Sequence, residues 1–455
     1  MLTIINTRLG ENKGVPRVWL EGSRLSSSFS VGQQLNVVID RVNHIVKLEV
    51  AQKGRISVSK RVRNGREHPL IELKDTDLKE LFGAIGVLLR VVIKDGVASI
   101  EAHKFSQNIV DRVKRFNHKI VTGEPLSFGS LCTGAGILDS AVHDGLEKVG
   151  IASYAKFIVE QEKKYIDAMV SNQSKRFRSD SIIIESPIEF VDLKRNPPKL
   201  DVCISGLPCT GASIAGLTKN KIKFAEDHET AGACFFYFLQ FIDQCQPSLI
   251  ILENVGAYLN TSSMAVICSV LTCWGYDLDH AIVNGVVHGS LENRDRLCLV
   301  ATTKGLKPFK MSNLKPLHEK PAFVGDILED IPLDSDIWRT YSYLEDKAIR
   351  DKAAGKGFAR TIIDGTETSV PTLRRLYHKA GSCDTFVGHP DGVRSRLFTP
   401  KEHCAIKQVP FELIDGVSNS VAHEILGQSV CYPVFTALGV AIGNWILSEA
   451  FTEAA

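Results

Sequence analysis

Short apolar runs alternate with longer amphipathic stretches from residue 126 to the end of the chain. Each run has the length of a buried strand, and the runs cover residues 126–131, 157–160, 181–185, 201–205, 247–252, 283–287 and 297–301. Strands that alternate with helices are typical of a doubly wound, mostly parallel sheet. We therefore predict an α/β domain in which ligands bind where the strands end.

The first 118 residues show a different pattern, and they repeat it. Residues 16–50 and 69–102 each predict a strand, a short helix or turn, and two further strands joined by a turn. Val37-Val38-Ile39 precedes Val91-Val92-Ile93 by 54 positions. Neither half can bury its apolar face alone, so we expect the two to pair as one small β-barrel. The pattern is loosely similar to swapped-hairpin domains of the AbrB and SymE-like kind.

The composition excludes several classes of protein. No apolar run reaches the length of a membrane span, and the first residues lack the basic region and apolar core of a secretory signal. The 11 Cys are an odd number, and no C-x-x-C or H-x-x-x-H pair stands out. This usage favours free thiols in a reducing cytoplasm and argues against a metal site.

A net charge of +2 conceals an asymmetry between the two parts of the chain. Residues 1–123 hold 21 Lys and Arg against 12 Asp and Glu, a balance of +9, which leaves −7 for the remainder. The densest basic stretch, residues 53–66, lies between the two halves of the repeat. It is either a phosphate-binding surface or a solvated connector. We interpret the amino-terminal module as a DNA-binding or dimerisation domain.

The most informative stretch is residues 201–213, which read DVCISGLPCTGAS. An apolar strand runs into Gly206 and Pro208 and presents Cys209 just beyond the break. An open α/β sheet offers a reactive side chain in this way. The thiolate is the attacking form of Cys, so the site must activate it. The alternative is a buried structural Cys in a strand-to-loop turn.

Two other strand ends carry residues suited to holding a ligand. Gly134 and Gly136 follow the first strand and open a helix, an arrangement that lets the backbone approach a ligand. Glu160 ends the second strand, where a carboxylate can accept hydrogen bonds from ribose hydroxyls. The alternative for Glu160 is a surface acid that opens a helix.

Candidate acidic and basic site residues stand at strand ends in the second half of the predicted sheet. Glu253 and Asn254 end the fifth strand, where the acid is a candidate proton donor. Arg294 and Arg296 enter the last strand two positions apart, so both point to one face. Taken alone, these two Arg more often form a surface ion pair, here with Asp295 or Glu292.

The order of these motifs, G-x-G, P-C, E-N-V and R-x-R, resembles the DNA cytosine-5 methyltransferase family, including its RNA-acting relatives. The segments R-L-F-T-P-K-E at 396–402 and G-Q-S-V at 427–430 extend the resemblance. It implies a Rossmann-like methyltransferase domain at 119–304 and 396–455, with a target-recognition domain inserted at 305–395. The basic module at 1–118 precedes them.

The resemblance implies a mechanism. Cys209 would attack C6 of a cytosine flipped out of double-stranded DNA, while Glu253 holds or protonates N3. Carbon C5 would then take a methyl group from S-adenosylmethionine. Asn254 would position the loop, and Arg294 and Arg296 would orient Glu253 and bind the base.

The family resemblance also suggests two further sets of residues and no metal site. The cofactor set is Thr133, Gly134, Gly136, Glu160, Ser186, Pro208, Gln428 and Ser429. The DNA-binding set is Ser213, Arg374 and Arg375. Glu292 stands where the family has Gln, and Cys132 where it has Phe. These departures keep open a catalytically inactive DNA-binding regulator, and action on RNA is the other alternative. Otherwise the resemblance implies a cytoplasmic, prokaryotic or phage-encoded enzyme of a restriction-modification kind, with a possible homodimer through the amino-terminal module.

Overall fold

A computed structural model describes residues 1–193, 197–208, 226, 232–355 and 359–453, which form two compact units, Met1–Asp111 and Arg112–Ala455. The division falls inside helix α2 (Lys104–Thr122) rather than at residue 118. The reason is that Arg112 and Phe116 are buried in the second unit.

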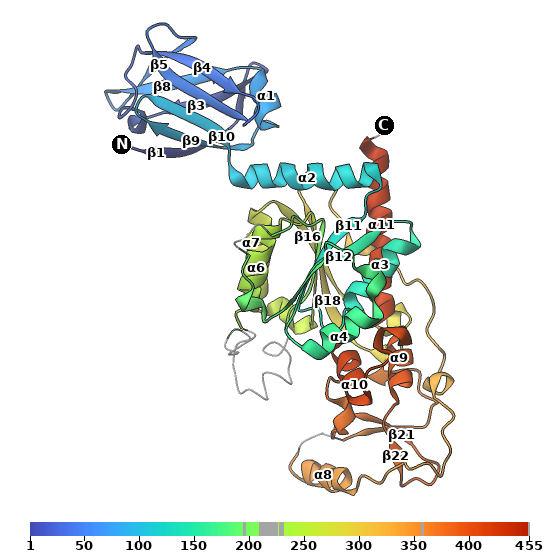
Figure 1. Cartoon of the computed structure of the whole chain (residues 1–455). Helices are drawn as coiled ribbons and strands as arrows, with labels where there is room; N and C mark the ends of the chain where they lie inside the picture. The colour runs from blue at the N-terminus through green and yellow to red at the C-terminus, as the bar shows by residue number, and fades with distance from the viewer. Residues whose placement is uncertain (194–196, 209–225, 227–231, 356–358, 454–455) are drawn as a thin grey trace. The chain divides into compact units, whose positions relative to one another are not determined.

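The first unit consists of ten strands in two sheets that share one core (Figure 1). The strand orders are β1-β9-β10-β5-β4-β6 and β2-β3-β8-β7. Val46 and Val91 come from the first sheet, and Val18 and Ile71 from the second. The elements are β1 (Thr3–Arg8), β2 (Gly10–Asn12), β3 (Val15–Glu21), η1 (Ser23–Leu25), β4 (Gln34–Asp40), β5 (Ile45–Ala51), β6 (Ile56–Ser57), β7 (Ser59–Arg63), β8 (Arg66–Lys74), α1 (Asp77–Phe82), β9 (Leu88–Lys94) and β10 (Val97–Ala102).

The internal repeat predicted from the sequence is visible in the strand pairing. Equivalent strands of the two halves pair antiparallel, β3 with β8 and β5 with β10. The hairpin β4–β5 closes at Asp40 and Ile45, whereas β9–β10 closes at Lys94 and Val97. The second connection is therefore two residues shorter, which explains why the spacing of the repeat falls from 54 to 52 residues across it.

The second unit is built on a seven-stranded sheet of order β13-β12-β11-β14-β15-β18-β16. The first five strands are parallel, and β18 runs antiparallel to both of its neighbours. The strands are β11 (Leu126–Leu131), β12 (Ser153–Glu160), β13 (Ile182–Glu185), β14 (Val202–Gly206), β15 (Leu249–Asn254), β16 (Tyr276–Asn284) and β18 (Asp295–Thr303). The strand predicted at 283–287 was wrong: β16 ends at Asn284, and Val286–His288 is a 3-10 turn.

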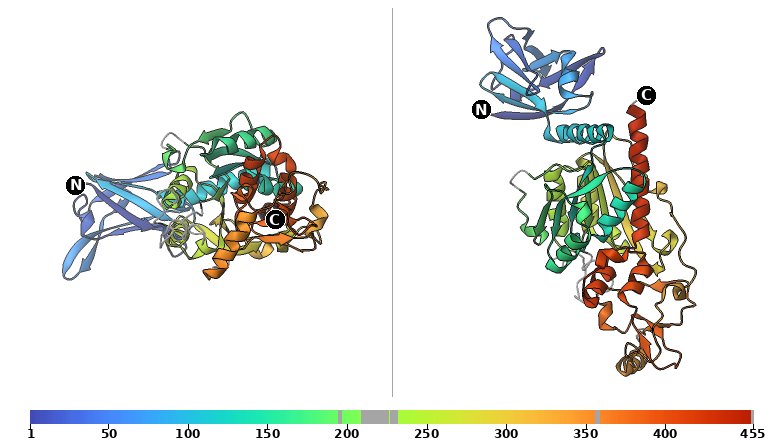
Figure 2. Two further views of the ribbon diagram at one scale, coloured as in Figure 1. Left: turned by 90° about the horizontal axis from the view of Figure 1, so that it is seen from below. Right: turned by 45° about the vertical axis from the view of Figure 1, so that its right-hand side comes forward.

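Helices cover both faces of this sheet (Figure 1). Helices α6 (Cys234–Cys245) and α7 (Ser262–Cys273) lie on one face. Helices α3 (Ile137–Lys148) and α11 (Tyr432–Glu453) pack side by side on the other. The right-hand view in Figure 2 shows α11 running alongside the sheet. Helix α4 (Lys163–Asn172) follows β12.

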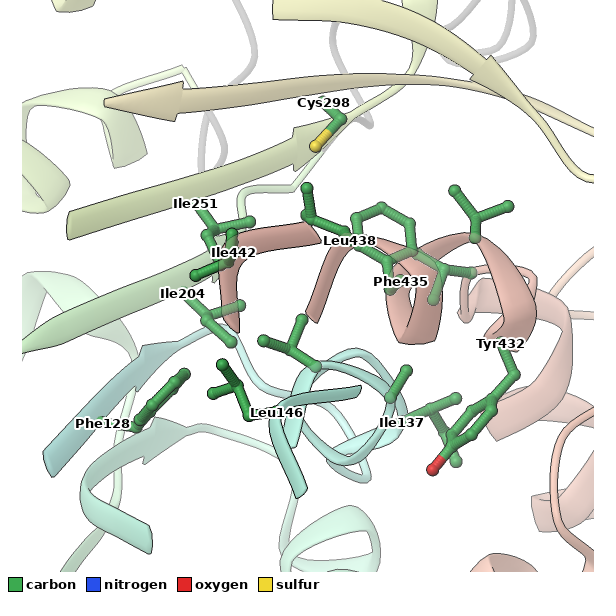
Figure 3. Close-up of a cluster of buried hydrophobic side chains, with 14 of the residues drawn as sticks. Phe128, Ile137, Leu146, Ile204, Ile251, Cys298, Tyr432, Phe435, Leu438 and Ile442 are labelled. Carbon is green, nitrogen blue, oxygen red and sulfur yellow. The ribbon is translucent and has the colours of Figure 1, made fainter. Parts of the chain in front are cut away.

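Two glycines let α3 and α11 approach closely. A Cβ at Gly145 or Gly439 would collide with the backbone of the opposite helix. Figure 3 shows the core that results, with Ile204 of the sheet beside Ile442 of α11 and Phe128 beside Leu146 of α3.

Residues 305–395 belong to the second unit and share their core with its neighbouring segments. Val324, Tyr377 and Val387 pack with Leu291 and with Phe398 from outside the insert. The elements of this part are η7 (Met311–Asn313), η8 (Val324–Ile327), α8 (Ser342–Ala353), β19 (Thr361–Ile363), β20 (Val370–Pro371), η9 (Tyr377–Lys379), β21 (Thr385–Gly388) and β22 (Ser395–Arg396). After it come α9 (Pro400–Lys407), η10 (Phe411–Ile414) and α10 (Asn419–Gln428).

A search of the residues that the structure describes finds no single helix long and apolar enough to cross a membrane. The pair Asn419–Gln428 and Tyr432–Ser448, bent by 51°, has the length and composition of a broken span. Most of the side chains in the pair are buried.

Arg112 anchors α2 to the second unit. Its guanidinium donates to Thr303 Oγ1 and Gln246 Oε1, both at 2.8 Å, and to the Trp274 carbonyl at 2.7 Å. The side chain is 1% exposed and lies over the ring of Tyr276.

Replacing Arg112 by methionine is expected to destabilise the second unit by about 3 kcal/mol or more, because several buried acceptors lose their donor. Native-state hydrogen exchange of the β16 and β18 amides would measure this loss separately from the first unit. Lys114→Met, an exposed change on the same helix, is the control and should leave protection within about 0.5 kcal/mol. Unchanged protection in Arg112→Met would contradict the anchoring role.

Candidate active site

The motifs found in the sequence meet at one edge of the seven-stranded sheet. Parallel strands end at the same edge, so the segments that follow β11, β12, β14 and β15 are neighbours. Gly206 pairs in register with Glu253, and Glu160 pairs with Glu185. The edge therefore has a half next to β12 and a half next to β15, with the end of β14 near the middle.

Glu160 organises the half of the edge next to β12. Its Oε2 accepts from the amide of Gly134 at 2.7 Å, and its Oε1 accepts from the amides of Gln161 and Glu162 at 2.9 and 3.0 Å. The residue is 7% exposed. A carboxylate oxygen has two lone pairs, so Oε2 keeps one with which to accept a ligand hydroxyl.

The turn after β11 depends on unusual backbone angles. Gly134 and Gly136 have φ of 59° and 72°, and Cys132 has φ of 55° although it is not glycine. A Cβ at Gly136 would collide with the amide of Gln173. A Cβ at Gly134 would lie 3.5 Å from Nε2 of Gln428, so this side chain borders the turn. Burial raises the pKa of the Cys132 thiol well above its ordinary value, and Cys234 and Glu160 add to the shift.

Of the other predicted cofactor residues, Thr133 belongs to this turn, Ser186 follows β13 and Ser429 follows α10. Thr133 donates from Oγ1 to Ser130 at 2.8 Å, and Ser186 donates from its amide to the Glu160 carbonyl at 3.0 Å. Ser429 is half-buried after the end of α10. A turn with two glycines beside a carboxylate with a spare lone pair fits the adenosine and methionine parts of S-adenosylmethionine.

Asp139 on α3 is a buried carboxyl group that the sequence did not single out. Its Oδ1 has no hydrogen-bond partner among the described residues, and burial raises its pKa to about 6 although Ser130 donates to the carboxyl group. The folded protein therefore keeps this proton to higher pH than the unfolded chain, whose carboxyl group ionises near 3.8. Asp139 therefore adds to the free energy of unfolding at low pH, and this contribution is lost as the pH rises from about 4 to about 6.

Asp139→Asn is expected to be more stable than the natural protein at pH 8, by up to about 3 kcal/mol, because the amide cannot ionise. The difference should shrink toward zero near pH 4. Urea unfolding midpoints at several pH values would test this, with the exposed Asp167→Asn on α4 as the control. A gain in stability that does not depend on pH would contradict the assignment.

Glu253 and Arg296 form an ion pair on the other half of the edge. Oε1 of Glu253 lies 2.9 Å from Nε of Arg296, and both side chains are largely buried. A Cβ at Gly206 would lie 3.5 Å from Oε2 of Glu253 and 4.0 Å from the Cys132 carbonyl. Gly206 thus leaves space between the carboxylate and the turn that follows β11.

Asn254 holds the segment that leads to Cys209. Its Nδ2 donates to the Leu207 carbonyl at 3.1 Å, while its Oδ1 accepts from the Val255 amide at 2.8 Å. Pro208 is half-buried just beyond that bond. Cys209 and Ser213, the predicted nucleophile and a predicted DNA contact, lie outside the described residues.

Arg294 does not take the position expected of it. Its guanidinium lies 3.5 Å from Glu292, measured from Nη1, and donates to the carbonyls of Gly427 and Gln428. We predicted that both Arg would orient Glu253, and of the two only Arg296 pairs with it. The reason is that β18 begins at Asp295, so Arg294 lies outside the strand, where residues two positions apart need not share a face, and it is buried beside Glu292.

Arg374 and Arg375 also have protein partners. Arg374 donates from Nε to Asp384 at 2.9 Å. Arg375 lies 3.8 Å from Glu162, directly after the Glu160 loop, and near the ring of Tyr165. Both side chains are about half exposed, so a DNA role for them stays a prediction.

One buried residue of this region was missed by sequence reasoning. Lys407 on α9 is completely buried and pairs with Glu292 at 2.6 Å. The only signal was a lone Lys in the apolar stretch C-A-I-K, and its partner lies 115 residues earlier. Among the described residues, no group of three or more His, Cys, Asp or Glu is arranged to hold a metal ion.

Comparison with known proteins identifies the family. A model of the family "C-5 cytosine-specific DNA methylase" matches residues 126–444. Type II methyltransferase M.NlaX of Neisseria lactamica is 29% identical over 249 residues, which are 53% of this chain and 75% of that protein. Type II methyltransferase M.HpaII of Haemophilus parainfluenzae is 26% identical over 267 residues, which are 54% of this chain and 72% of that protein.

Solved structures share the fold. The Dnmt2 methyltransferase of S. pombe has a TM-score of 0.55 at 14% identity, covering 71% of this chain and 99% of that one. The methyltransferase EhMeth of Entamoeba histolytica has a TM-score of 0.53 at 16% identity, covering 73% and 99%. The predicted α/β methyltransferase fold is confirmed. Because this family model matches residues 126–444, which include the whole seven-stranded sheet, the chain belongs to the C-5 cytosine-specific DNA methylase family.

Proposed function

We propose that this protein transfers a methyl group from S-adenosylmethionine to C5 of a cytosine within a specific double-stranded DNA sequence. The observation that carries this proposal is the Glu253–Arg296 pair, which lies next to Gly206 at the end of β14, three residues before Cys209 in the sequence. A carboxyl group for the ring nitrogen and a thiol for C6 would then act from adjacent strands. The base must leave the duplex to reach them.

Each side chain has a defined task in this reaction. The Cys209 thiolate forms a bond to C6, while Glu253 holds a proton or hydrogen bond at N3 and so draws electrons from the ring. Once Cys209 is bonded to C6, C5 is nucleophilic and accepts the methyl group that the bound cofactor supplies. Loss of the C5 proton then restores the ring and breaks the bond between Cys209 and C6.

Two residues support the reacting groups. Arg296 fixes the orientation of Glu253 through the 2.9 Å ion pair. Asn254 fixes Leu207, two positions before Cys209, through the bond to its carbonyl. On the cofactor side, Oε2 of Glu160 accepts a ribose hydroxyl, and Gln428 and Ser429 close the site.

Bisulfite sequencing of DNA from cells that express the protein tests the activity and finds the target sequence together. We expect 5-methylcytosine at one short sequence. Purified protein should also form a stable adduct with duplexes of that sequence carrying 5-fluorocytosine when S-adenosylmethionine is present. Methylation of RNA but not of duplex DNA, or an absence of methylation in both, would overturn the proposal.

We assign target recognition to residues 305–395 and an electrostatic DNA contact to the amino-terminal module. The hairpin of β7 and β8 supports the second assignment, because every residue of β7 (SKRVR) is exposed. Lys60 and Arg63 project from this strand, and Arg66 begins the next. Glu67 and Glu21 pair with some of these cations, which DNA phosphates would replace.

Replacing Lys60, Arg63 and Arg66 together by glutamine is expected to weaken DNA binding at low salt. The slope of log affinity against log salt should fall by about 0.9 for each DNA phosphate that the variant no longer neutralises. Fluorescence anisotropy across a salt series measures both quantities. The control replaces the exposed Lys47 and Lys94 of the six-stranded sheet. Equal effects of the two sets would argue against a specific role for the hairpin.

A further inference from the structure

The backbone carbonyls of three consecutive residues at the end of α10 accept hydrogen bonds from two buried cationic side chains. Arg294 Nη2 lies 3.4 Å from the Gly427 oxygen and 3.5 Å from the Gln428 oxygen. Lys407 Nζ donates to the Ser429 oxygen at 3.2 Å. Carbonyls at a helix carboxyl terminus carry partial negative charge, so cations are favourable there. These two side chains therefore hold the end of α10.

Glu292 joins the two cations into one cluster. Its Oε2 lies 2.6 Å from Lys407 Nζ, and its Oε1 lies 3.5 Å from Arg294 Nη1. Cys431 Sγ also approaches Oε2, at 3.4 Å. Glu292 and Lys407 are fully buried, so neither charge is stable there without the other.

Glu292 also binds the insert. Its Oε1 accepts from the amide of Leu373 at 2.7 Å. Gly427 lies against the backbone of Arg374, where a Cβ would collide with the Arg374 carbonyl. One carboxylate thus fixes the end of α10, the start of α11 and the segment that precedes Arg374.

The segment held in this way borders the cofactor site. Gln428 reaches the G-x-G turn, since its Nε2 lies 3.5 Å from where a Cβ of Gly134 would be. A shift of the α10 end would carry Gln428 away from that turn. The counter-charge of the Glu292 carboxylate in this buried cluster is Lys407.

We propose that the Glu292–Lys407 pair is a positioning device that sets the segment 427–431 and thereby the affinity for S-adenosylmethionine. This inference rests on the proposed function, because it assumes that the turn after β11 binds that cofactor. Neither residue is catalytic; both act through the carbonyls of the closing segment and through Arg294. Burial and the charge of Arg294 lower the pKa of Lys407 to about 8, which agrees with a crowded cationic site.

Calorimetric titration of the full-length protein with S-adenosylmethionine, in the absence of DNA, tests the pair directly. Glu292→Gln leaves the buried cations Arg294 and Lys407 without an anion. Lys407→Met leaves the Glu292 carboxylate with Arg294 as its only cation in this cluster. We expect each single variant to weaken binding at least about tenfold. The double variant restores the net charge of the cluster and should bind more tightly than either single variant, but more weakly than the natural protein because the Ser429 carbonyl has lost its donor. Lys401→Met, an exposed change on the same helix, is the matched control.

The outcomes separate this inference from the proposed function. Single variants that bind like the natural protein, or a double variant no better than the singles, would overturn the pairing. Thermal unfolding of each variant without cofactor identifies any single variant that fails to fold. In that case the cofactor affinity of the double variant tests the pairing. In steady-state assays the single variants should raise the KM for the cofactor and largely keep kcat. A natural protein that binds no S-adenosylmethionine would refute the proposed function itself.

Discussion

Replacing Cys209 by alanine is expected to reduce methyl transfer to DNA by at least about 10⁴-fold, because no other group can form the bond to C6. Cytosine C5 is a poor nucleophile until a thiolate adds at C6, so the methyl group has no acceptor without that bond. DNA binding should persist in the variant, since the contacts with phosphates and bases are made elsewhere. Radiolabelled methyl incorporation into a target duplex would measure the loss.

The same stretch of sequence supplies a matched control. Cys203 lies six residues earlier in β14, is fully buried, and burial raises the pKa of its thiol well above the ordinary value. Cys203→Ala should therefore keep most of the activity and still form the 5-fluorocytosine adduct. Loss of the adduct in Cys203→Ala with retention in Cys209→Ala would reverse the assignment.

Replacing Glu253 by glutamine is expected to lower kcat by about 10²- to 10⁴-fold, the range in which general acids contribute. An amide can donate a hydrogen bond to N3 but cannot supply a proton as the ring accepts the thiolate. The structure holds this carboxylate with Arg296 at 2.9 Å, so Arg296→Met should also lower kcat. The combined variant should lose less than the product of the two single losses, because the residues act as a unit.

Single-turnover kinetics at saturating cofactor and DNA would separate these effects from changes in binding. Glu147→Gln, at the exposed end of α3, is the control for removal of a carboxylate. A fall of less than tenfold in Glu253→Gln would show that the ring nitrogen is activated by another group.

Much of the fold and half of the site followed from local pattern. The strand at 201–205, the glycine turn at 134–136 and the acid at 160 depend on periods of a few residues, and the chain order of the motifs placed them on neighbouring strands. The repeat of the amino-terminal module was visible for the same reason. The end of β16 was misjudged because the valines at 283, 286 and 287 look locally like one apolar run, although Asn284 and Gly285 between them mark a turn.

The sequence by itself determined which strands exist, which reactive side chains stand at their ends, and the chemistry those side chains can perform. Only the tertiary structure decided the partners of Arg294, the burial of Arg112 and the pairing of Glu292 with Lys407. Secondary structure responds to neighbours within a few positions. A buried charge, by contrast, is tolerated only where a distant segment brings its counter-charge, and that depends on how the whole chain packs.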